Sequence, residues 1–143
     1  MNLTTCLVIM AGGAIGTLAR YMLAALAMPF SQQLPWGTIL INIVGSFVIG
    51  FIGTLTLASG KFPVTENVRL FVMVGLCGGF TTFSAFSLQT FDLLRAGAAD
   101  RAFVNVVVSF AMCILAVAAG HAIAAKFNGD ATEIAQVGIE EDA

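Results

Sequence analysis

Charged side chains are scarce in this chain of 143 residues. Asp, Glu, Lys and Arg together make up 10% of it, whereas hydrophobic residues make up 59%, and the mean hydropathy is strongly positive. A soluble domain is typically about one quarter charged. These proportions exclude an ordinary soluble domain and predict a protein embedded in a lipid bilayer. The few basic residues form no patch, which argues against nucleic acid as a partner.

Side chains that commonly catalyse reactions or bind metals are also few. The cysteines, Cys6, Cys77 and Cys113, fall in three different apolar segments, and no pair has metal-ligand or redox-motif spacing. No two acidic residues share an apolar segment, and the sequence offers no nucleophile–base pair. We therefore expect no enzyme activity, and we interpret the cysteines as small apolar packing residues.

Four apolar segments are each long enough to cross a bilayer, which takes about 20 helical residues. They cover approximately residues 3–28, 36–58, 70–94 and 102–125. The sequence thus predicts an all-α membrane protein whose four transmembrane helices form one domain, residues 1–126. The remaining tail, residues 127–143, carries five acidic side chains and neither Lys nor Arg. We expect this tail to be disordered.

Glycines recur at helical spacing in the first two segments. Gly12 and Gly16 lie four residues apart in the first, and Gly45, Gly50 and Gly53 lie in the second. Small residues at such spacing allow helix backbones to approach closely in lipid. We therefore expect tightly packed helix crossings.

The third segment has an unusual centre, GLCGGFTTFSAFS, at residues 75–87. It holds three glycines, two adjacent threonines and two serines. Glycine loses much backbone entropy in a helix, and Thr and Ser hydroxyls compete for backbone partners. In hydrocarbon, an opened backbone is tolerated only where protein or a polar cavity covers it. We predict that the third helix is broken at mid-membrane and that the break is functional.

Phenylalanines and neutral hydrogen-bond donors gather beside this predicted break. Phe80, Phe83 and Phe86 share one helical face, and Thr82 and Ser84 lie among them. Such a stripe more often packs a core, and Ser and Thr more often bond their own helix. An aromatic ring has a positive edge, however, so ring edges and neutral donors together could receive an anion without binding it too tightly. Their crowding favours an anion pathway.

Three polar residues in the other segments could join such a pathway. Asn42 lies in the second segment and Ser109 in the fourth, although an intramembrane Asn often only links two helices. Arg20, near the end of the first segment, could attract an anion into a vestibule. Alternatively, it is an interfacial arginine whose stem lies along the membrane.

The basic residues divide evenly between the two ends of the predicted bundle. Three lie at one end and three at the other: Arg20, Arg95 and Arg101 against Lys61, Arg69 and Lys126. The positive-inside bias should therefore be weak, and a chain inserted in both orientations could dimerise antiparallel. Four helices of this size leave little room for a polar pathway within one subunit. We expect a homodimer.

Three stretches together resemble the fluoride channel family, the Fluc or CrcB-type proteins. They are GGAIGTLARY at residues 12–21, GTILINIVGSFVIG at 37–50 and GLCGGFTTFSAFS at 75–87, of which the last is the most specific. The resemblance covers residues 5–125. It implies a dual-topology antiparallel homodimer with two pores in the bacterial inner membrane. It also implies passive, fluoride-selective export that lowers the cytoplasmic fluoride concentration.

The resemblance further assigns roles to individual residues. For the fluoride pathway it implies Asn42, Phe83, Phe86, Thr82, Ser84, the vestibule residue Arg20 and, as a weaker match, Ser109. It implies one structural sodium ion at the dimer centre, held by the backbone carbonyls of Gly78 and Thr81. Phe80 departs from the family pattern, which more often has Leu there.

Two other functions stay open at this point. One is a small multidrug-type, proton-coupled exporter, which has similar length and often dual topology. Such an exporter needs an intramembrane acid, but the first segment has none, and Asp92 lies near the end of the third, where it could simply pair with Arg95. The other is a non-transporting membrane anchor or assembly subunit.

Overall fold

The protein is all-helical over the residues that the computed structural model describes, 2–58 and 60–129. Four helical spans are long and apolar enough to cross a membrane: Leu3–Phe30, Trp36–Leu55, Glu66–Arg95 and Ala99–Phe127. This confirms the predicted four-helix membrane architecture. The predicted disordered tail lies outside the described residues from residue 130 onward.

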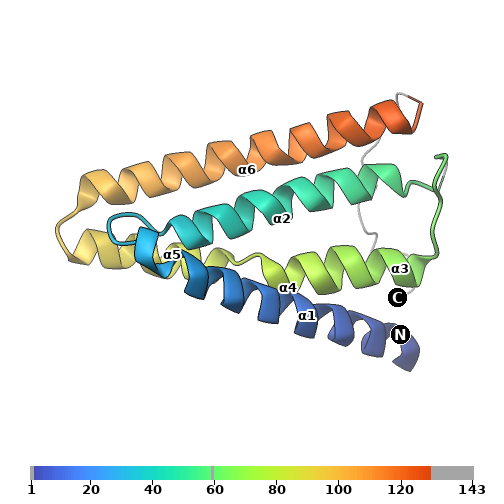
Figure 1. Ribbon diagram of the computed structural model, residues 1–143, viewed down its shortest axis with the longest axis horizontal. Helices are drawn as coiled ribbons and strands as arrows, with labels where there is room; N and C mark the ends of the chain where they lie inside the picture. The colour runs from blue at the N-terminus through green and yellow to red at the C-terminus, as the bar shows by residue number, and fades with distance from the viewer. Residues whose placement is uncertain (1, 59, 130–143) are drawn as a thin grey trace.

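The first, second and fourth spans are regular, whereas the third is composite. The elements in chain order are α1 (Leu3–Ala27), the 3₁₀ turn η1 (Met28–Phe30), α2 (Trp36–Leu55), α3 (Glu66–Arg69), the π-helix η2 (Leu70–Cys77), α4 (Gly78–Phe80), α5 (Phe83–Arg95) and α6 (Ala99–Phe127). Successive spans run in opposite directions, so the connection before α2 and the α5–α6 turn lie at one end of the bundle (Figure 1).

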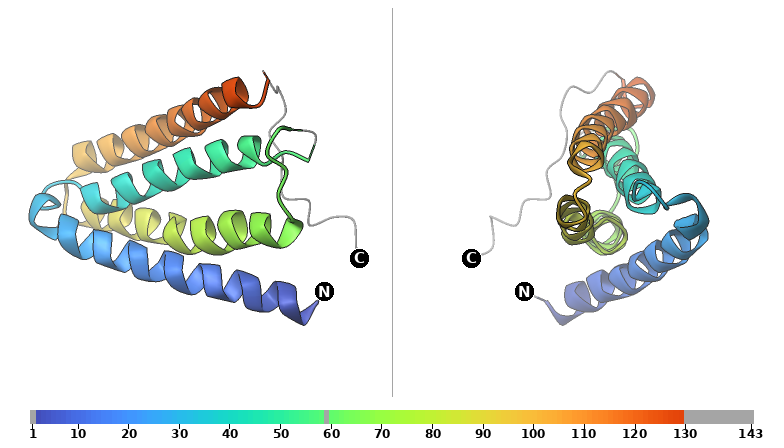
Figure 2. Two further views of the ribbon diagram at one scale, coloured as in Figure 1. Left: turned by 45° about the vertical axis from the view of Figure 1, so that its right-hand side comes forward. Right: turned by 90° about the vertical axis from the view of Figure 1, so that its left-hand side faces the viewer.

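The helices pack as two close pairs, α1 along η2 and α4, and α2 along α6 (Figures 1 and 2). Glycines bring the backbones of each pair into contact. A Cβ atom added at Gly16 would lie 2.2 Å from the Leu76 carbonyl oxygen, and one at Gly120 would lie 2.3 Å from that of Phe47. Each of these crossings therefore requires glycine.

The second helix ends at Leu55, earlier than the predicted residue 58. The hydroxyl of Thr56 donates to the Ile52 carbonyl at 2.7 Å, and Arg69 Nη1 donates to the Thr56 carbonyl at 2.7 Å. The last carbonyls of a helix have no partner within it. A guanidinium from the third span therefore caps the second, which sequence spacing alone does not reveal.

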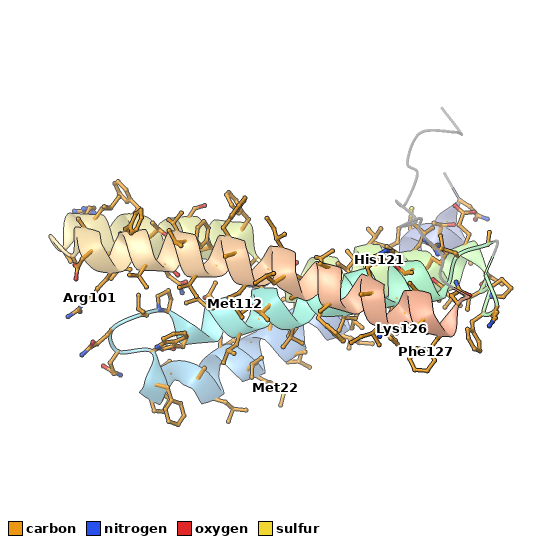
Figure 3. All side chains as sticks on the ribbon, turned by 90° about the horizontal axis from the view of Figure 1, so that it is seen from above. Met22, Arg101, Met112, His121, Lys126 and Phe127 are labelled. Carbon is orange, nitrogen blue, oxygen red and sulfur yellow. The ribbon has the colours of Figure 1, made fainter. Side chains whose placement is uncertain are left out.

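The fourth helix begins at Ala99, earlier than the predicted residue 102, and continues to Phe127. Asp100 lies in its first turn and Lys126 in its last, where each complements the helix dipole. Arg101 and Lys126 lie towards opposite ends of α6 in Figure 3.

Large apolar side chains cover the outside of the bundle. Phe103 is 69% exposed and Phe110 is 70% exposed. Side chains such as those of Met112 and Phe127 stand out from α6 (Figure 3). Such extensive exposed apolar surface marks a membrane or protein contact.

The glycine contacts predict a sharp difference between two neighbouring positions of α1. Gly16→Ala should lower the unfolding free energy by about 1–3 kcal/mol, because the added methyl group collides with backbone atoms of the third span. Gly13→Ala is the matched control, since the nearest atom to its added Cβ is 4.0 Å away. Thermal denaturation in detergent measures both. Equal midpoints for the two variants would contradict the close crossing.

Candidate functional site

The third span is interrupted at two residues. α4 ends at Phe80 and α5 begins at Phe83, and Figure 1 shows a non-helical link between them. Thr81 has φ −77° and ψ 160°, and Thr82 has φ −155° and ψ 112°, which are extended conformations. The helical hydrogen-bond ladder therefore stops here, and the backbone groups of the link need other partners.

Asn42 on α2 supplies two of those partners. Its Nδ2 donates to the Thr82 carbonyl at 3.1 Å, and its Oδ1 accepts from the Thr82 N–H at 2.8 Å. The side-chain amide thus pairs with one residue of the link much as a neighbouring backbone would. A backbone polar group without a partner in hydrocarbon costs several kcal/mol, so this pair stabilises the interruption.

The link also caps the helices on either side of it. Thr82 Oγ1 accepts from the Ala85 N–H at 3.1 Å, as an N-cap of α5, and lies 3.2 Å from Ser84 Oγ. Thr81 Oγ1 donates back to the Cys77 carbonyl at 2.9 Å. Because α5 starts here, the positive end of its dipole also lies at the interruption.

Arg20 contacts the interruption from the side of α1. Its Nε donates to the Gly79 carbonyl at 3.1 Å, and the Thr17 hydroxyl lies within 3.5 Å of the same oxygen. The predicted vestibule arginine therefore binds backbone just before the break.

An open groove of about 710 Å³ lies beside the interruption. Seven of the nine predicted site residues line it: Asn42, Gly78, Thr81, Thr82, Phe83, Phe86 and Ser109. The two that do not are Ser84, which contacts Thr82, and Arg20, which contacts Gly79. Elements far apart in sequence (α2, the third span and α6) thus bring most of the predicted residues to one surface.

The two predicted pore phenylalanines lie together on this groove. The ring centroids of Phe83 and Phe86 are 5.4 Å apart, with the ring planes tilted by 41°. The Phe83 side chain is 78% exposed. One chain therefore leaves part of this aromatic surface uncovered.

The carbonyls of Gly78 and Thr81 are among those at the interruption that lack their regular helical partners. In a continuous helix, the Thr82 N–H would bond to the Gly78 carbonyl and the Ala85 N–H to the Thr81 carbonyl. Here the first donates to Asn42 and the second to Thr82 Oγ1. Oxygen ligands suit hard cations, so these two carbonyls fit the chemistry expected of a sodium site. Within residues 2–58 and 60–129, no three His, Cys, Asp or Glu side chains gather into an alternative metal site.

Residues 7–121 match the family model described as CrcB-like protein, Camphor Resistance (CrcB). The chain belongs to the CrcB-like family. It is 66% identical over 142 residues to the fluoride-specific ion channel FluC of Methylobacterium radiotolerans, with 99% of each chain covered. It is 64% identical over 144 residues to the FluC of Gluconobacter oxydans, with both chains fully covered. It is 40% identical over 126 residues to the FluC of Pyrococcus abyssi, covering 88% of this chain and all of that protein.

This membership confirms the family that the three sequence stretches indicated. The CrcB-like match includes the interruption and all the residues that line the groove. It ends before the acidic tail, whereas the FluC proteins of Methylobacterium radiotolerans and Gluconobacter oxydans align over 99% and 100% of this chain and so include the tail.

Sequence reasoning missed several residues that line the groove. They are Gly45, Ser46 and Ile49 on α2, Met73 and Cys77 on η2, and Val106, Phe110, Cys113 and Ile114 on α6. The signal for the α2 residues was present, because positions three, four and seven residues after Asn42 share its helical face. On α6, Val106 and Cys113 carried the same signal, because they lie three residues before and four residues after Ser109, whereas Phe110 and Ile114 did not.

Proposed function

We propose that this chain forms a fluoride-selective channel that passively exports fluoride across the bacterial inner membrane and so lowers its cytoplasmic concentration. The observation that carries the proposal is the groove, which joins Asn42, Phe83 and Phe86 beside an interrupted span. It is supported by full-length relatives, 66% and 64% identical, that are named fluoride-specific ion channels.

The chemistry of the groove suits a small, strongly hydrated anion. Fluoride needs hydrogen-bond donors to replace its water, and Asn42 Nδ2 has a second N–H besides the one bonded to Thr82. The positive end of α5 and the ring edges of Phe83 and Phe86 add favourable potential without a full charge. Binding is then weak enough for the ion to leave, as conduction requires. Chloride is larger and would fit a narrow path poorly.

A second, antiparallel copy would complete the pathway. The groove is open, and Phe83 is largely exposed. The basic residues are nearly balanced, with Arg95 and Arg101 towards one end of the bundle and Lys61, Arg69 and Lys126 towards the other, whereas Arg20 bonds to Gly79 beside the interruption. In this proposal two copies, inserted in opposite orientations, cover each other's grooves and form two pores.

A structural sodium ion at the centre of this dimer is part of the proposal. The carbonyls of Gly78 and Thr81 from both copies would hold it, because their regular donors bond elsewhere. When bound, the ion would neutralise these oxygens and place a positive charge between the pores. Asn42 and the Thr82 hydroxyl accept hydrogen bonds from the N–H groups that would otherwise bond to the Gly78 and Thr81 carbonyls, so these carbonyls stay outside the helical hydrogen-bond ladder.

The exporter alternative gains no support. A proton-coupled exporter would need a carboxylate within the membrane. Asp92 is exposed near the C-terminal end of α5 and does not line the groove. The relatives from Methylobacterium radiotolerans, Gluconobacter oxydans and Pyrococcus abyssi are named as channels.

Substitution of the aromatic pair tests the pathway. Phe83→Ile and Phe86→Ile should each reduce fluoride efflux at least tenfold, because the ring edges that receive the anion are lost. A fluoride electrode records the efflux from proteoliposomes, and size-exclusion chromatography checks assembly. Phe51→Ile is the matched control, since Phe51 stacks on Phe47 but does not line the groove. Wild-type efflux from both groove variants would remove the two rings from the pathway.

The sodium proposal predicts a cation-specific stabilisation. The thermal midpoint of the detergent-solubilised protein should rise with sodium concentration. A ligand that binds only the folded state raises the unfolding free energy by about 1.4 kcal/mol for each tenfold increase in its concentration above the dissociation constant. Potassium and N-methyl-D-glucamine at equal ionic strength serve as controls. Identical midpoints in all three salts would count against the site.

The antiparallel dimer predicts two orientations of one chain. A C-terminal alkaline phosphatase fusion, active only in the periplasm, and a C-terminal green fluorescent protein fusion, fluorescent only in the cytoplasm, should both give strong signals. The weak positive-inside bias is the reason. Signal from a single fusion would show one fixed orientation and overturn dual topology.

A further inference from the structure

Beyond the groove surface, a partly buried series of hydrogen bonds joins α5 to α6. The Thr90 hydroxyl donates to the Phe86 carbonyl at 2.7 Å, Asn105 Nδ2 donates to Thr90 Oγ1 at 2.8 Å, and the Ser109 hydroxyl donates to Asn105 Oδ1 at 3.4 Å. Asn105 is 1% exposed and Ser109 is 6% exposed. Of these residues, Phe86 and Ser109 also line the groove.

The donor and acceptor of every hydrogen bond in this series are fixed by the Phe86 carbonyl at one end of it. The Phe86 carbonyl has no proton, so Thr90 must donate its only hydroxyl proton to it. Thr90 Oγ1 can then only accept, which requires the NH₂ group of Asn105 to face it. Asn105 Oδ1 is thereby left facing Ser109, and Ser109 must donate.

This direction decides what Ser109 can offer an anion. A hydroxyl has one proton and two lone pairs, so while Ser109 donates to Asn105 only lone pairs remain for other partners. The bond is nevertheless weak, because 3.4 Å lies well beyond the usual 2.7–2.8 Å for a hydroxyl donor. The hydroxyl can therefore turn to an anion in the groove, but Asn105 Oδ1, which is buried, then loses its donor.

We propose that Thr90 and Asn105 are positioning residues that hold the Ser109 hydroxyl proton away from the groove and so weaken the binding of fluoride there. The inference rests on the proposed fluoride channel function. Conduction gives the reason for such an arrangement, because a channel needs a donor that can bind a passing anion but binds it weakly enough to release it.

The variant that tests this inference is Thr90→Val, which keeps the side-chain shape and removes the hydroxyl. The Asn105 amide is then free to reverse and donate to Ser109 Oγ, which releases the Ser109 proton to the groove. The half-saturating fluoride concentration for efflux should fall about fivefold, the change expected when one neutral hydrogen bond is gained.

Four further variants isolate the effect. Thr90→Ser retains the hydroxyl and should restore wild-type half-saturation. Ser109→Ala combined with Thr90→Val should give no shift relative to Ser109→Ala alone. Ser87→Ala is the matched control, because Ser87 also bonds the carbonyl four residues earlier on α5, at 3.0 Å, but does not line the groove.

The outcomes separate this inference from the channel function itself. Absence of fluoride efflux from the wild-type protein would refute the proposed function. Normal wild-type efflux, with a half-saturating concentration unchanged in Thr90→Val, would refute the inference alone. A change in maximal efflux or thermal midpoint without a change in half-saturation would show that the series of hydrogen bonds is only structural, and would also refute it. A shift that persists in the double variant would exclude Ser109 as the mediator.

Discussion

The pair of hydrogen bonds between the Asn42 amide and the backbone of Thr82 is the interaction on which the site depends. A membrane-spanning segment normally satisfies its own backbone, because hydrocarbon offers no partners. An interruption is therefore stable only where another segment supplies both a donor and an acceptor. An asparagine side chain carries both within one planar group, and α2 presents it at the level of the link. The groove, the start of α5 and the loss of the regular helical donors of the Gly78 and Thr81 carbonyls all follow from this exchange.

Support for the interruption comes from two helices rather than one. On the α1 side, the Gly79 carbonyl accepts from Arg20, and a Cβ atom added at Gly79 would lie 2.6 Å from the Gly13 carbonyl oxygen. On the α2 side, Asn42 binds the next part of the chain. The link is therefore held between a close backbone contact and a polar pair. A rigid link of this kind keeps Phe83 and Thr82 in fixed positions at the groove.

Much of this arrangement could be predicted from the sequence because it is encoded locally. Hydropathy located the four spans, and the crowding of Gly, Thr and Ser located the unusual centre of the third. The contacts made by Arg20 and Arg69 could not be predicted, because each joins residues of different spans and has no periodic signature. The same holds for the hydrogen bonds of Asn42, whose side chain could equally have linked two regular helices. The bound cation and the second copy lie beyond what one chain displays, and remain proposals.

The π-helix η2 has a consequence for the rotational phase of the third span. Its hydrogen bonds join residues five apart instead of four, so the residues after it are rotated about the span axis relative to a continuous α-helix. Gly75 and Gly79 then meet α1, whereas Gly78 and Thr81 meet the groove. Gly78 and Gly79 are adjacent in sequence, yet one lies on the groove and the other packs against α1. A one-residue insertion or deletion within Leu70–Cys77 would rotate those faces by about 100° about the span axis, placing a side chain where two backbones touch and moving the interruption away from Asn42.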